Sequence, residues 1–435
     1  MSAYLIKKIA EENRSGKQAG LYSVCSANEL VLRAALRDAA RKRYPLIIES
    51  TANQVNQFGG YTGILPSQFF SWVKKIAAEE SMPEENLILG GDHLGPVLWQ
   101  NENENSAMEK AAELVKAYTL AGFTKIHLDT SMKLADDPPG ALDPRICARR
   151  GALLARVVYS SLDKMPNQAA RPVLVIGSEV PIPGGQKSAG LTENDENILP
   201  TKAEDFLEQV EIFKNEFKKQ GLDFGDVAAF VVQPGVEFGD DSVFYYDPEK
   251  AKALCGALKK VPGLVFEGHS TDYQTPGKLA ELVRDGIAIL KVGPGLTFAL
   301  REGLFLLEAA EETLVPETRR SNLKKTLLRV MDEDKSYWEK YYSGTAEQIE
   351  FKKLYSYSDR CRYYLPVVNV QTAINRLFSN VPHVPPALLS QFFPAQYKRF
   401  AAGLLSNDPV SIICDRIGET CTVYAAACGY GGRSS

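Results

Sequence analysis

The sequence predicts an α/β protein, a (β/α)8 TIM barrel with a C-terminal helical extension. Two observations favour this fold class. Short apolar runs rich in β-branched residues alternate with longer segments of helical periodicity, and eight such runs can be counted. This alternation indicates parallel βα units, and eight units favour a closed barrel over a doubly wound sheet. A length of 435 residues leaves room for a barrel and an appended segment.

The predicted strands and helices follow one another from the N-terminal region onward. The strands are expected at Gly20–Cys25, Pro45–Ser50, Leu87–Gly91, Lys125–Asp129, Pro172–Glu179, Val227–Gln233, Leu264–His269 and Ile287–Val292. The helical segments between them include Ala27–Lys42, Ser67–Glu80, Ser106–Ala121, Thr201–Gln220 and Pro248–Lys260. The proline-rich segment Asp136–Pro144 is expected to be a loop after the fourth strand.

The barrel is predicted to occupy residues 1–310 and to carry the functional site. From Glu311 onward the chain is rich in Lys, Arg, Glu, Leu and Tyr and shows no strand alternation. Residues 311–435 are therefore interpreted as a helical extension packed on the barrel, with Asn380–Pro386 as a proline-rich loop inside it.

The composition argues against several classes of protein. Charges of both signs are balanced to a net charge of −4, which gives no electrostatic basis for binding nucleic acid or an anionic membrane. No apolar stretch approaches the roughly 18–20 residues of a membrane span, and Lys7 and Lys8 interrupt the N-terminus before a signal core could form. Seven cysteines without CxxC spacing are typical of a reducing compartment, so a cytoplasmic protein is expected. Cys414, Cys421 and Cys428 are interpreted as small apolar filler rather than a soft-metal site.

Polar residues close most of the predicted strands. They are Glu49, Asp92, His93, Asp129, Glu179, Gln233, His269 and Lys291. Because the chemistry of such barrels takes place at the carboxyl ends of the strands, these residues predict a site there. Two imidazoles, one carboxylate and one amide oxygen, from His93, Glu179, Gln233 and His269, suit a divalent metal with a position left for substrate. Zn²⁺ is the expected ion, with Mn²⁺, Ni²⁺ and Co²⁺ as alternatives.

Other residues receive weaker assignments. His127 is expected to be a histidine of the barrel interior whose ring nitrogens have hydrogen-bond partners. Glu267 is expected to orient a metal ligand without binding the metal itself, or to be a salt-bridge partner, and His383 to be a structural or solvated residue. Gly293-Pro-Gly295 before a helix suggests a cradle for an anion, to which Ser270 and Thr271 add hydroxyl groups. The segment 184–188, Gly-Gly-Gln-Lys-Ser, lacks the leading glycine of a P-loop, so a Walker-type nucleotide site is not expected.

Long motifs resemble the Z subunit of tagatose-bisphosphate aldolase. They cover Ser50–Gly63, Leu89–Pro96, Lys125–Asp129, Gly177–Gly185, Val231–Phe238, Gly268–Thr275, Lys291–Arg301 and Ser358–Tyr364. The family is similar to metal-dependent class II aldolases with a barrel fold; its members have been called tagatose-6-phosphate kinases, non-catalytic partners of the aldolase, or ketose 4-epimerases. The resemblance implies that His93 and His269 bind metal and that Asp92 handles a proton. Gln233 stands where class II aldolases have a third histidine.

The favoured reading is a metal-dependent 4-epimerase that interconverts fructose and tagatose, or their phosphates. The C4 hydrogen of a 2-ketose is not acidic, so this route breaks and rejoins the C3–C4 bond. Asp92, Asp129 and Glu179 are the expected catalytic residues. The expected substrate-binding residues are Asn53, Gln54, Gln57, Ser270, Asp272, Gly293 and Gly295, with Arg360 and Arg362 as phosphate ligands.

Two other readings stay open. The chain could be a non-catalytic Z subunit that stabilises and activates a class II tagatose-1,6-bisphosphate aldolase. It could also be a Schiff-base aldolase that uses Lys291 or Lys125, although two strand-end histidines would then be idle. The expected partners are a ketose or ketose phosphate, the aldolase catalytic subunit under the second reading, and further copies of the chain in a homo-oligomer.

Overall fold

A computed structural model describes residues 2–165, 171–177 and 198–431 of the chain. Within these residues eight parallel strands close into a barrel in the order β1-β10-β9-β6-β5-β4-β3-β2, so the predicted fold class is confirmed. The barrel strands are β1 (Leu21–Cys25), β2 (Leu46–Thr51), β3 (Leu87–Leu94), β4 (Lys125–Leu128), β5 (Val173–Ile176), β6 (Val227–Val232), β9 (Val265–Gly268) and β10 (Ile287–Val292). The end of the predicted fifth strand, at Glu179, lies outside the described residues.

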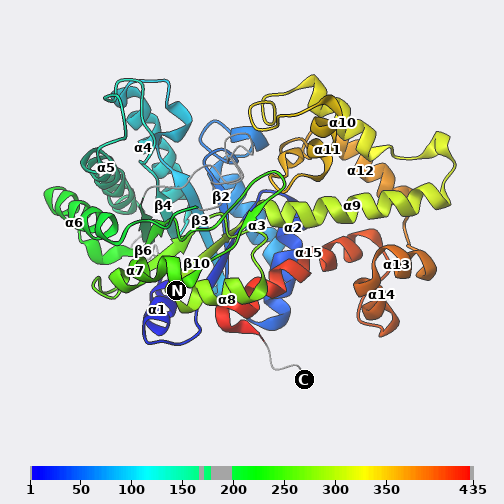
Figure 1. The fold of residues 1–435 in the computed structure, drawn as a ribbon, viewed down its shortest axis with the longest axis horizontal. Helices are drawn as coiled ribbons and strands as arrows, with labels where there is room; N and C mark the ends of the chain where they lie inside the picture. Colours follow the sequence, from blue (N-terminus) through cyan, green and yellow to red (C-terminus); the bar gives the residue numbers. More distant parts are fainter. Residues whose placement is uncertain (1, 166–170, 178–197, 432–435) are drawn as a thin grey trace.

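A helix follows each barrel strand and packs around the outside of the barrel (Figure 1). These helices are α2 (Glu29–Lys42), α3 (Pro66–Glu79), α4 (Glu104–Ala121), α5 (Pro144–Leu162), α6 (Ala203–Lys219), α7 (Pro248–Leu258), α8 (Pro276–Arg284) and α9 (Pro294–Leu314). Several begin with a capped turn and a proline, as at Asp143-Pro144 and Asp247-Pro248, where the aspartate accepts a hydrogen bond from a backbone N–H. A short antiparallel hairpin of β7 (Glu237–Phe238) and β8 (Val243–Phe244), not predicted from the sequence pattern, follows β6. In the described part of the chain, no helix has the length and apolar character needed to cross a bilayer.

Helix α1 (Ser2–Arg14) closes the amino-terminal end of the barrel. Its Ile6 and Ile9 pack with inward-facing strand residues such as Ile47 and Ile88. Asn13 anchors the end of the helix, since its Nδ2 donates to the carbonyl oxygens of Ala19 (2.9 Å) and Val283 (2.7 Å). With this end filled, the carboxyl ends of the strands are left for a site.

The extension is helical and gathers on one side of the barrel (Figure 1). Its helices are α10 (Leu323–Glu333), α11 (Ala346–Tyr355), α12 (Val368–Asn380), α13 (Pro386–Phe392), α14 (Pro394–Ala401) and α15 (Pro409–Ala425). The predicted proline-rich loop lies between α12 and α13. Helix α15 returns to the barrel and packs on α2 and α9, and its Cys414 and Cys421 are buried in the core, as is Cys428 beyond it. The division of the chain at residue 310 stays a prediction, because α9 runs unbroken through this position.

Candidate metal centre and cavity

The end of β3 places a histidine in the barrel mouth through an irregularity in its pairing with β4. The pairing of β3 with β4 shifts register between Gly91 and Leu94, and His93 has a φ of 50°. This left-handed conformation is costly for a residue with a Cβ and is often found at functional sites. A Cβ atom on Gly90 would lie 2.5 Å from Oε1 of Glu49, so the glycine leaves room for this buried carboxylate.

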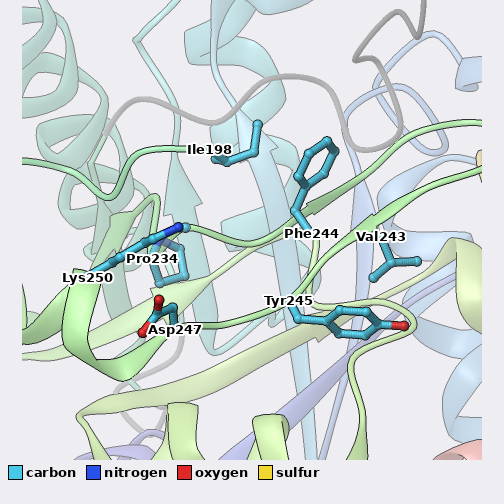
Figure 2. Close-up of a pocket in the computed structure, with 8 residues that line it drawn as sticks. Ile198, Pro234, Val243, Phe244, Tyr245, Asp247 and Lys250 are labelled. Carbon is cyan, nitrogen blue, oxygen red and sulfur yellow. The ribbon is translucent and has the colours of Figure 1, made fainter. Parts of the chain in front are cut away.

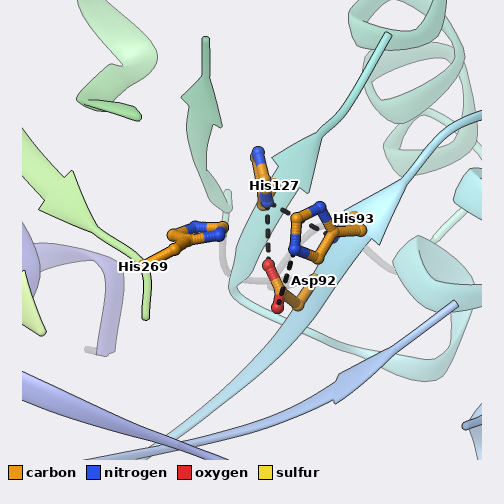
Figure 3. A group of neighbouring side chains, drawn as sticks. All are labelled: Asp92, His93, His127 and His269. Carbon is orange, nitrogen blue, oxygen red and sulfur yellow. Dashed lines mark hydrogen bonds and ion pairs between the residues drawn. The ribbon is translucent and has the colours of Figure 1, made fainter. Parts of the chain in front are cut away.

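Three histidines from three strands converge at this point (Figure 3). His93 comes from β3, His127 from β4, and His269 directly follows β9. The ring centroids are 5.0 Å apart for His93 and His127, 4.9 Å for His93 and His269, and 5.3 Å for His127 and His269. One potential ligand atom from each histidine and one from Asp92 all lie within 4.8 Å of one another. This spacing is suited to a single metal ion.

A carboxylate holds one ring nitrogen of each histidine. The contacts join His93 Nδ1 to Asp129 Oδ2 (2.7 Å), His127 Nδ1 to Asp92 Oδ1 (2.8 Å), and His269 Nε2 to Glu267 Oε1 (3.1 Å). Such outer carboxylates fix the orientation of metal-binding histidines and the position of the ring proton. The backbone N–H of His93 also lies 3.2 Å from His127 Nδ1. The contact of Nδ1 with Asp92 Oδ1 is shorter, which places the ring proton of His127 on Nδ1.

The other nitrogen of His127 provides a test of whether a metal fits. Nε2 of His127 is buried and has no hydrogen-bond partner among the described residues. An unpaired buried acceptor is costly, whereas coordination of a cation would satisfy it. Three imidazole nitrogens suit Zn²⁺ and related divalent ions and leave a position for substrate. The residues present therefore fit a divalent metal.

Burial and neighbouring charges change the pKa values of the cluster in different directions. Burial opposes the charge on His93, but the carboxylates of Asp92 and Asp129 raise its pKa to about 9. For His269 burial prevails over the contact with Glu267 and lowers the pKa to about 4. The pKa of Asp92 stays well below its ordinary value because His93 and Lys291 outweigh its burial. The cluster thus combines a neutral imidazole, His269, with an ionised carboxylate, Asp92.

A network of buried ions lies beside the histidines. Lys125 Nζ is 2.5 Å from Glu49 Oε1 and 2.7 Å from Glu267 Oε2. Lys291 Nζ contacts Glu49 and lies 2.8 Å from Asp92 Oδ1. Despite its burial, these carboxylates raise the pKa of Lys291 well above its ordinary value. A protonated amine is not a nucleophile, so the network argues against a Schiff-base mechanism on Lys291.

The histidine cluster opens into a cavity of about 160 Å³. Most of the residues that the sequence marked for the site line this cavity. They are Asn53, Gln54, Asp92, His93, Asp129, His269, Ser270, Asp272, Lys291, Gly293 and Arg362. The cavity is also lined by Tyr61 and Tyr363, which the sequence analysis did not single out.

Other predicted residues are engaged elsewhere or not described. Gln233 Oε1 accepts hydrogen bonds from the N–H groups of Gly235 (2.8 Å) and Val236 (2.9 Å), so this oxygen closes the turn after β6. Gln57 Nε2 donates to the carbonyl oxygen of Lys110 (2.9 Å). Neither side chain lines the cavity. Glu179 and the segment 184–188 lie outside the described residues.

The predicted anion cradle before α9 is filled by the protein itself. Asp272 Oδ1 accepts hydrogen bonds from the N–H groups of Gly293 (3.0 Å) and Gly295 (2.7 Å). Burial raises the pKa of Asp272 to about 6, although these N–H groups oppose the shift. The two N–H groups are therefore not free for a substrate anion in this structure.

His127 is the residue whose environment differs most from the expectation. It lies in the barrel interior, as predicted, but it is not satisfied there, because its Nε2 lacks a partner among the described residues. The signal that could have identified it is the strand period: His127 and Asp129 lie two residues apart and share a face of the chain.

A second hollow lies beside the β7–β8 hairpin (Figure 2) and has a volume of about 280 Å³. Its lining includes Val243, Phe244, Tyr245, Asp247 and Lys250. None of the predicted site residues lines it, and it is separate from the histidine cluster.

Comparisons with known proteins give a consistent family. A profile of the family described as "D-tagatose-1,6-bisphosphate aldolase subunit GatZ/KbaZ-like" matches residues 6–429. A relative from Salmonella dublin, named D-tagatose-1,6-bisphosphate aldolase subunit GatZ, is 44% identical over 427 residues, which cover 97% of this chain and 99% of the relative. A relative of the same name from Salmonella enteritidis PT4 shows the same identity and coverage.

A solved structure is similar over the same length. The crystal structure of a probable tagatose 6 phosphate kinase from Sinorhizobium meliloti 1021 superimposes with a TM-score of 0.84 at 41% sequence identity. The alignment covers 94% of this chain and 100% of that chain. The barrel and its extension thus occur together in a relative.

Proposed function

Because the chain belongs to the D-tagatose-1,6-bisphosphate aldolase subunit GatZ/KbaZ-like family, we propose that it is a metal-dependent ketohexose 4-epimerase. It would interconvert fructose and tagatose, or their phosphates, by retro-aldol and aldol chemistry at the C3–C4 bond. The observation that carries this proposal is the convergence of three histidines, each held by a carboxylate. One of their ring nitrogens, Nε2 of His127, is buried and has no hydrogen-bond partner in the described residues.

The proposed metal ligands are His93, His127 and His269, with Zn²⁺ as the favoured ion. His127 takes the place that the sequence analysis gave to Gln233, whose side-chain oxygen is engaged in a turn. A bound divalent cation would polarise the C2 carbonyl of the ketose and stabilise the negative charge that develops when the C3–C4 bond breaks.

Asp92 is the proposed base for the C4 hydroxyl group. Its Oδ1 accepts hydrogen bonds from His127 and Lys291, while Oδ2 has weaker contacts, 3.9 Å from the Cys25 thiol and 3.7 Å from His93 Nε2. Oδ2 is therefore the oxygen available to a substrate hydroxyl. Lys291 keeps the carboxylate ionised, so Asp92 can accept the C4 hydroxyl proton as the bond breaks and return it when the bond re-forms.

The remaining cavity residues orient the sugar. Asn53, Gln54 and Ser270 offer amide and hydroxyl groups that suit sugar hydroxyls. Asp129 also lines the cavity, but its carboxylate is already bonded to the ring of His93 and fixes the orientation of that ring. The cavity of about 160 Å³ would hold the aldehyde fragment while its other face turns toward the nucleophilic carbon. Under this proposal the held fragment rejoins the nucleophilic carbon instead of being released.

A second function is favoured by the names of the relatives. Proteins 44% identical over almost the entire chain are named as subunits of tagatose-1,6-bisphosphate aldolase. Under this proposal the chain binds and activates a class II catalytic subunit, and the histidine cluster contributes a structural metal. The family's kinase names find less support, since no nucleotide-binding motif was recognised in the sequence.

The purified chain alone, assayed on fructose, tagatose and their 6-phosphates with metal analysis of the same sample, tests the first proposal. We expect interconversion that chelation abolishes and Zn²⁺ or Mn²⁺ restores. Asp92→Asn is assayed with Zn²⁺ in excess, because loss of this outer carboxylate is expected to weaken metal binding by about 10- to 100-fold. It should lose at least about 100-fold in kcat, the usual contribution of a general base. Full activity in metal-free protein would refute the proposal. No turnover with any metal, together with activation of a class II aldolase on mixing, would favour the subunit instead.

A further inference from the structure

Arg362 brings a positive charge from the extension into the cavity of the histidine cluster. It belongs to the short 3-10 helix η6 (Arg360–Tyr363) and lines this cavity together with Tyr363. Its Nη1 donates to the carbonyl oxygens of Ser358 (2.5 Å) and Asp359 (3.0 Å), and Nη2 donates to the hydroxyl of Tyr363 (3.1 Å). These neutral acceptors orient the guanidinium without neutralising it.

The charge of Arg362 is not paired within the described residues. No carboxylate of the described chain lies within 4.0 Å of its guanidinium, whereas the nearby Arg301 forms an ion pair with Asp359 at 2.8 Å. Arg360 differs in another way: it is buried and its guanidinium stacks 3.4 Å from the ring centre of Tyr341. The structure thus distinguishes the two arginines that the sequence suggested as phosphate ligands, since only Arg362 lines the cavity.

The extension holds η6 firmly against the barrel. Asp359, at a φ of 47°, accepts hydrogen bonds from Thr297 Oγ1 (2.6 Å) and Arg301 Nε (2.8 Å), both on α9. The hydroxyl of Tyr273 donates to the carbonyl oxygen of Tyr357 (2.6 Å). A left-handed aspartate with a buried ion pair is an expensive local structure, and its effect is to fix Arg362 at the mouth.

The other positive groups at the mouth are already neutralised. His93 is paired with Asp129 (2.7 Å), Lys291 is held by Glu49 and Asp92, and the N–H groups of Gly293 and Gly295 are bonded to Asp272. An anion in the cavity would therefore meet Arg362 as the available cation of the described residues. A narrow recess of about 40 Å³ beside Arg362 is also lined by Ser26 and Gln54 and by no histidine.

We propose that Arg362 binds the phosphate group of a phosphorylated ketose in this recess, while the ketose carbons lie at the histidine cluster. The sugar part of this inference rests on the proposed function. Arginine offers several N–H donors in a planar fork that matches phosphate oxygens. The extension is then part of the site, and Arg362 is the residue that selects phosphorylated over free ketose.

The test compares Arg362→Gln with Arg362→Lys and with Arg329→Gln. The last is a control that removes an exposed arginine on α10, which pairs with Glu333. Calorimetry measures binding of fructose 6-phosphate to each full-length protein, and kcat/KM is measured for fructose 6-phosphate and for fructose. Loss of a charge-assisted contact predicts a 10- to 100-fold weaker binding of fructose 6-phosphate to Arg362→Gln, an intermediate loss for Arg362→Lys, and less than a twofold change for Arg329→Gln.

Selectivity separates recognition of phosphate from a structural role. We expect the ratio of kcat/KM for phosphorylated over free fructose to fall by the same 10- to 100-fold in Arg362→Gln. Equal losses on both sugars, or unchanged binding, would overturn the inference. If wild-type protein turns over neither sugar, the proposed function fails and calorimetry alone decides the role of Arg362.

A measurement on wild-type protein covers the case in which Arg362→Gln does not fold. Inorganic phosphate should compete with fructose 6-phosphate in the calorimetric titration, because both would occupy the recess beside Arg362. Binding of fructose 6-phosphate that is unaffected by excess phosphate would contradict the inference.

Discussion

Asp92 connects the histidine cluster to the buried ions of the barrel. Its Oδ1 accepts hydrogen bonds from His127 and from Lys291, and Lys291 also contacts Glu49. Removing one partner from such a set leaves an uncompensated buried charge, at a cost of about 3–5 kcal/mol. The orientation of the His127 ring therefore depends on a charge network that extends to Glu49, which does not line the cavity. A metal site with outer ligands of this kind loses affinity when its surroundings change, even if its ligands are intact.

His127→Ala is expected to remove the divalent metal. Three histidines offer ring nitrogens to one point, and loss of one should weaken binding by more than the roughly 100-fold that follows loss of an outer carboxylate. Metal content after dialysis, with affinity from chelator competition, measures this. Gln233→Ala is the matched control, because its oxygen bonds backbone N–H groups and it should keep the metal. An unchanged metal content in His127→Ala, or its loss in Gln233→Ala, would contradict the proposed ligand set.

Many of the residues that line the cavity could be predicted from the sequence, but which of their polar atoms have hydrogen-bond partners could not. Asp92, His93 and His269 follow apolar strands, and the structure brings them together because parallel strands end at one edge of a barrel. The roles of His127 and Gln233 could not be predicted in the same way. Whether a ring nitrogen or an amide oxygen is free depends on partners in other strands and turns, which spacing along the chain does not show.

At the scale of elements, the loops after the strands shape the mouth. The predicted proline-rich loop before α5 is present, and a fully buried residue, Arg150, ties it down. Arg150 donates to Asp137 Oδ1 (2.7 Å) and Oδ2 (2.9 Å) and to Glu104 Oε2 (3.0 Å) on α4. The loop is thus joined to both neighbouring helices through one guanidinium. Patterns of apolar residues predicted the loop, but not this anchor, since long-range ion pairs leave no periodic signal.

Asp137→Asn should lower the free energy of unfolding by about 2–3 kcal/mol at neutral pH, because Arg150 would lose one of its two carboxylates. Arg150 holds the pKa of Asp137 below its ordinary value, although burial opposes this. A carboxyl group whose pKa falls on folding stabilises the protein above its unfolded pKa, about 3.9, and the stabilisation is lost as the pH falls through the lower folded value.

The difference in the free energy of unfolding between wild type and Asp137→Asn should therefore become smaller as the pH is lowered below about 4. Urea unfolding at a series of pH values measures it. Asp163→Asn removes the same charge at an exposed position after α5 and should change stability by less than about 0.5 kcal/mol. A difference between wild type and Asp137→Asn that grows on acidification would refute the assignment.

At the scale of the whole molecule, the extension is built into the barrel. Tyr424 on α15 donates to the carbonyl oxygen of Thr271 (2.7 Å), and Thr271 donates to the carbonyl oxygen of Lys291 (2.6 Å). Gln18 Nε2 donates to the carbonyl oxygen of Ala427 (2.6 Å), which joins the segment before β1 to the segment after α15. Composition predicted the helical character of the extension, because it shows no strand alternation. Its return to the barrel could not be predicted, since a contact between residues 409 positions apart, as for Gln18 and Ala427, depends on the assembled surface.

Removal of residues 409–435 is therefore expected to prevent folding of the barrel. The buried side chains lost from α15 include Ile412, Ile413, Ile417, Cys421 and Tyr424. At about 1.5–3 kcal/mol for each large apolar side chain, their burial contributes on the order of 10 kcal/mol, comparable to the 5–15 kcal/mol by which a typical protein is stable. Soluble yield and far-ultraviolet circular dichroism measure the outcome.

The matched control for this truncation is a chain that ends at Gly431, which keeps α15 and its contacts with the barrel. It should unfold in urea at the same midpoint as the full chain, because it retains every residue that packs in the core of the described structure. A chain ending at residue 408 that folds cooperatively with an unchanged midpoint would show that the barrel is independent of α15.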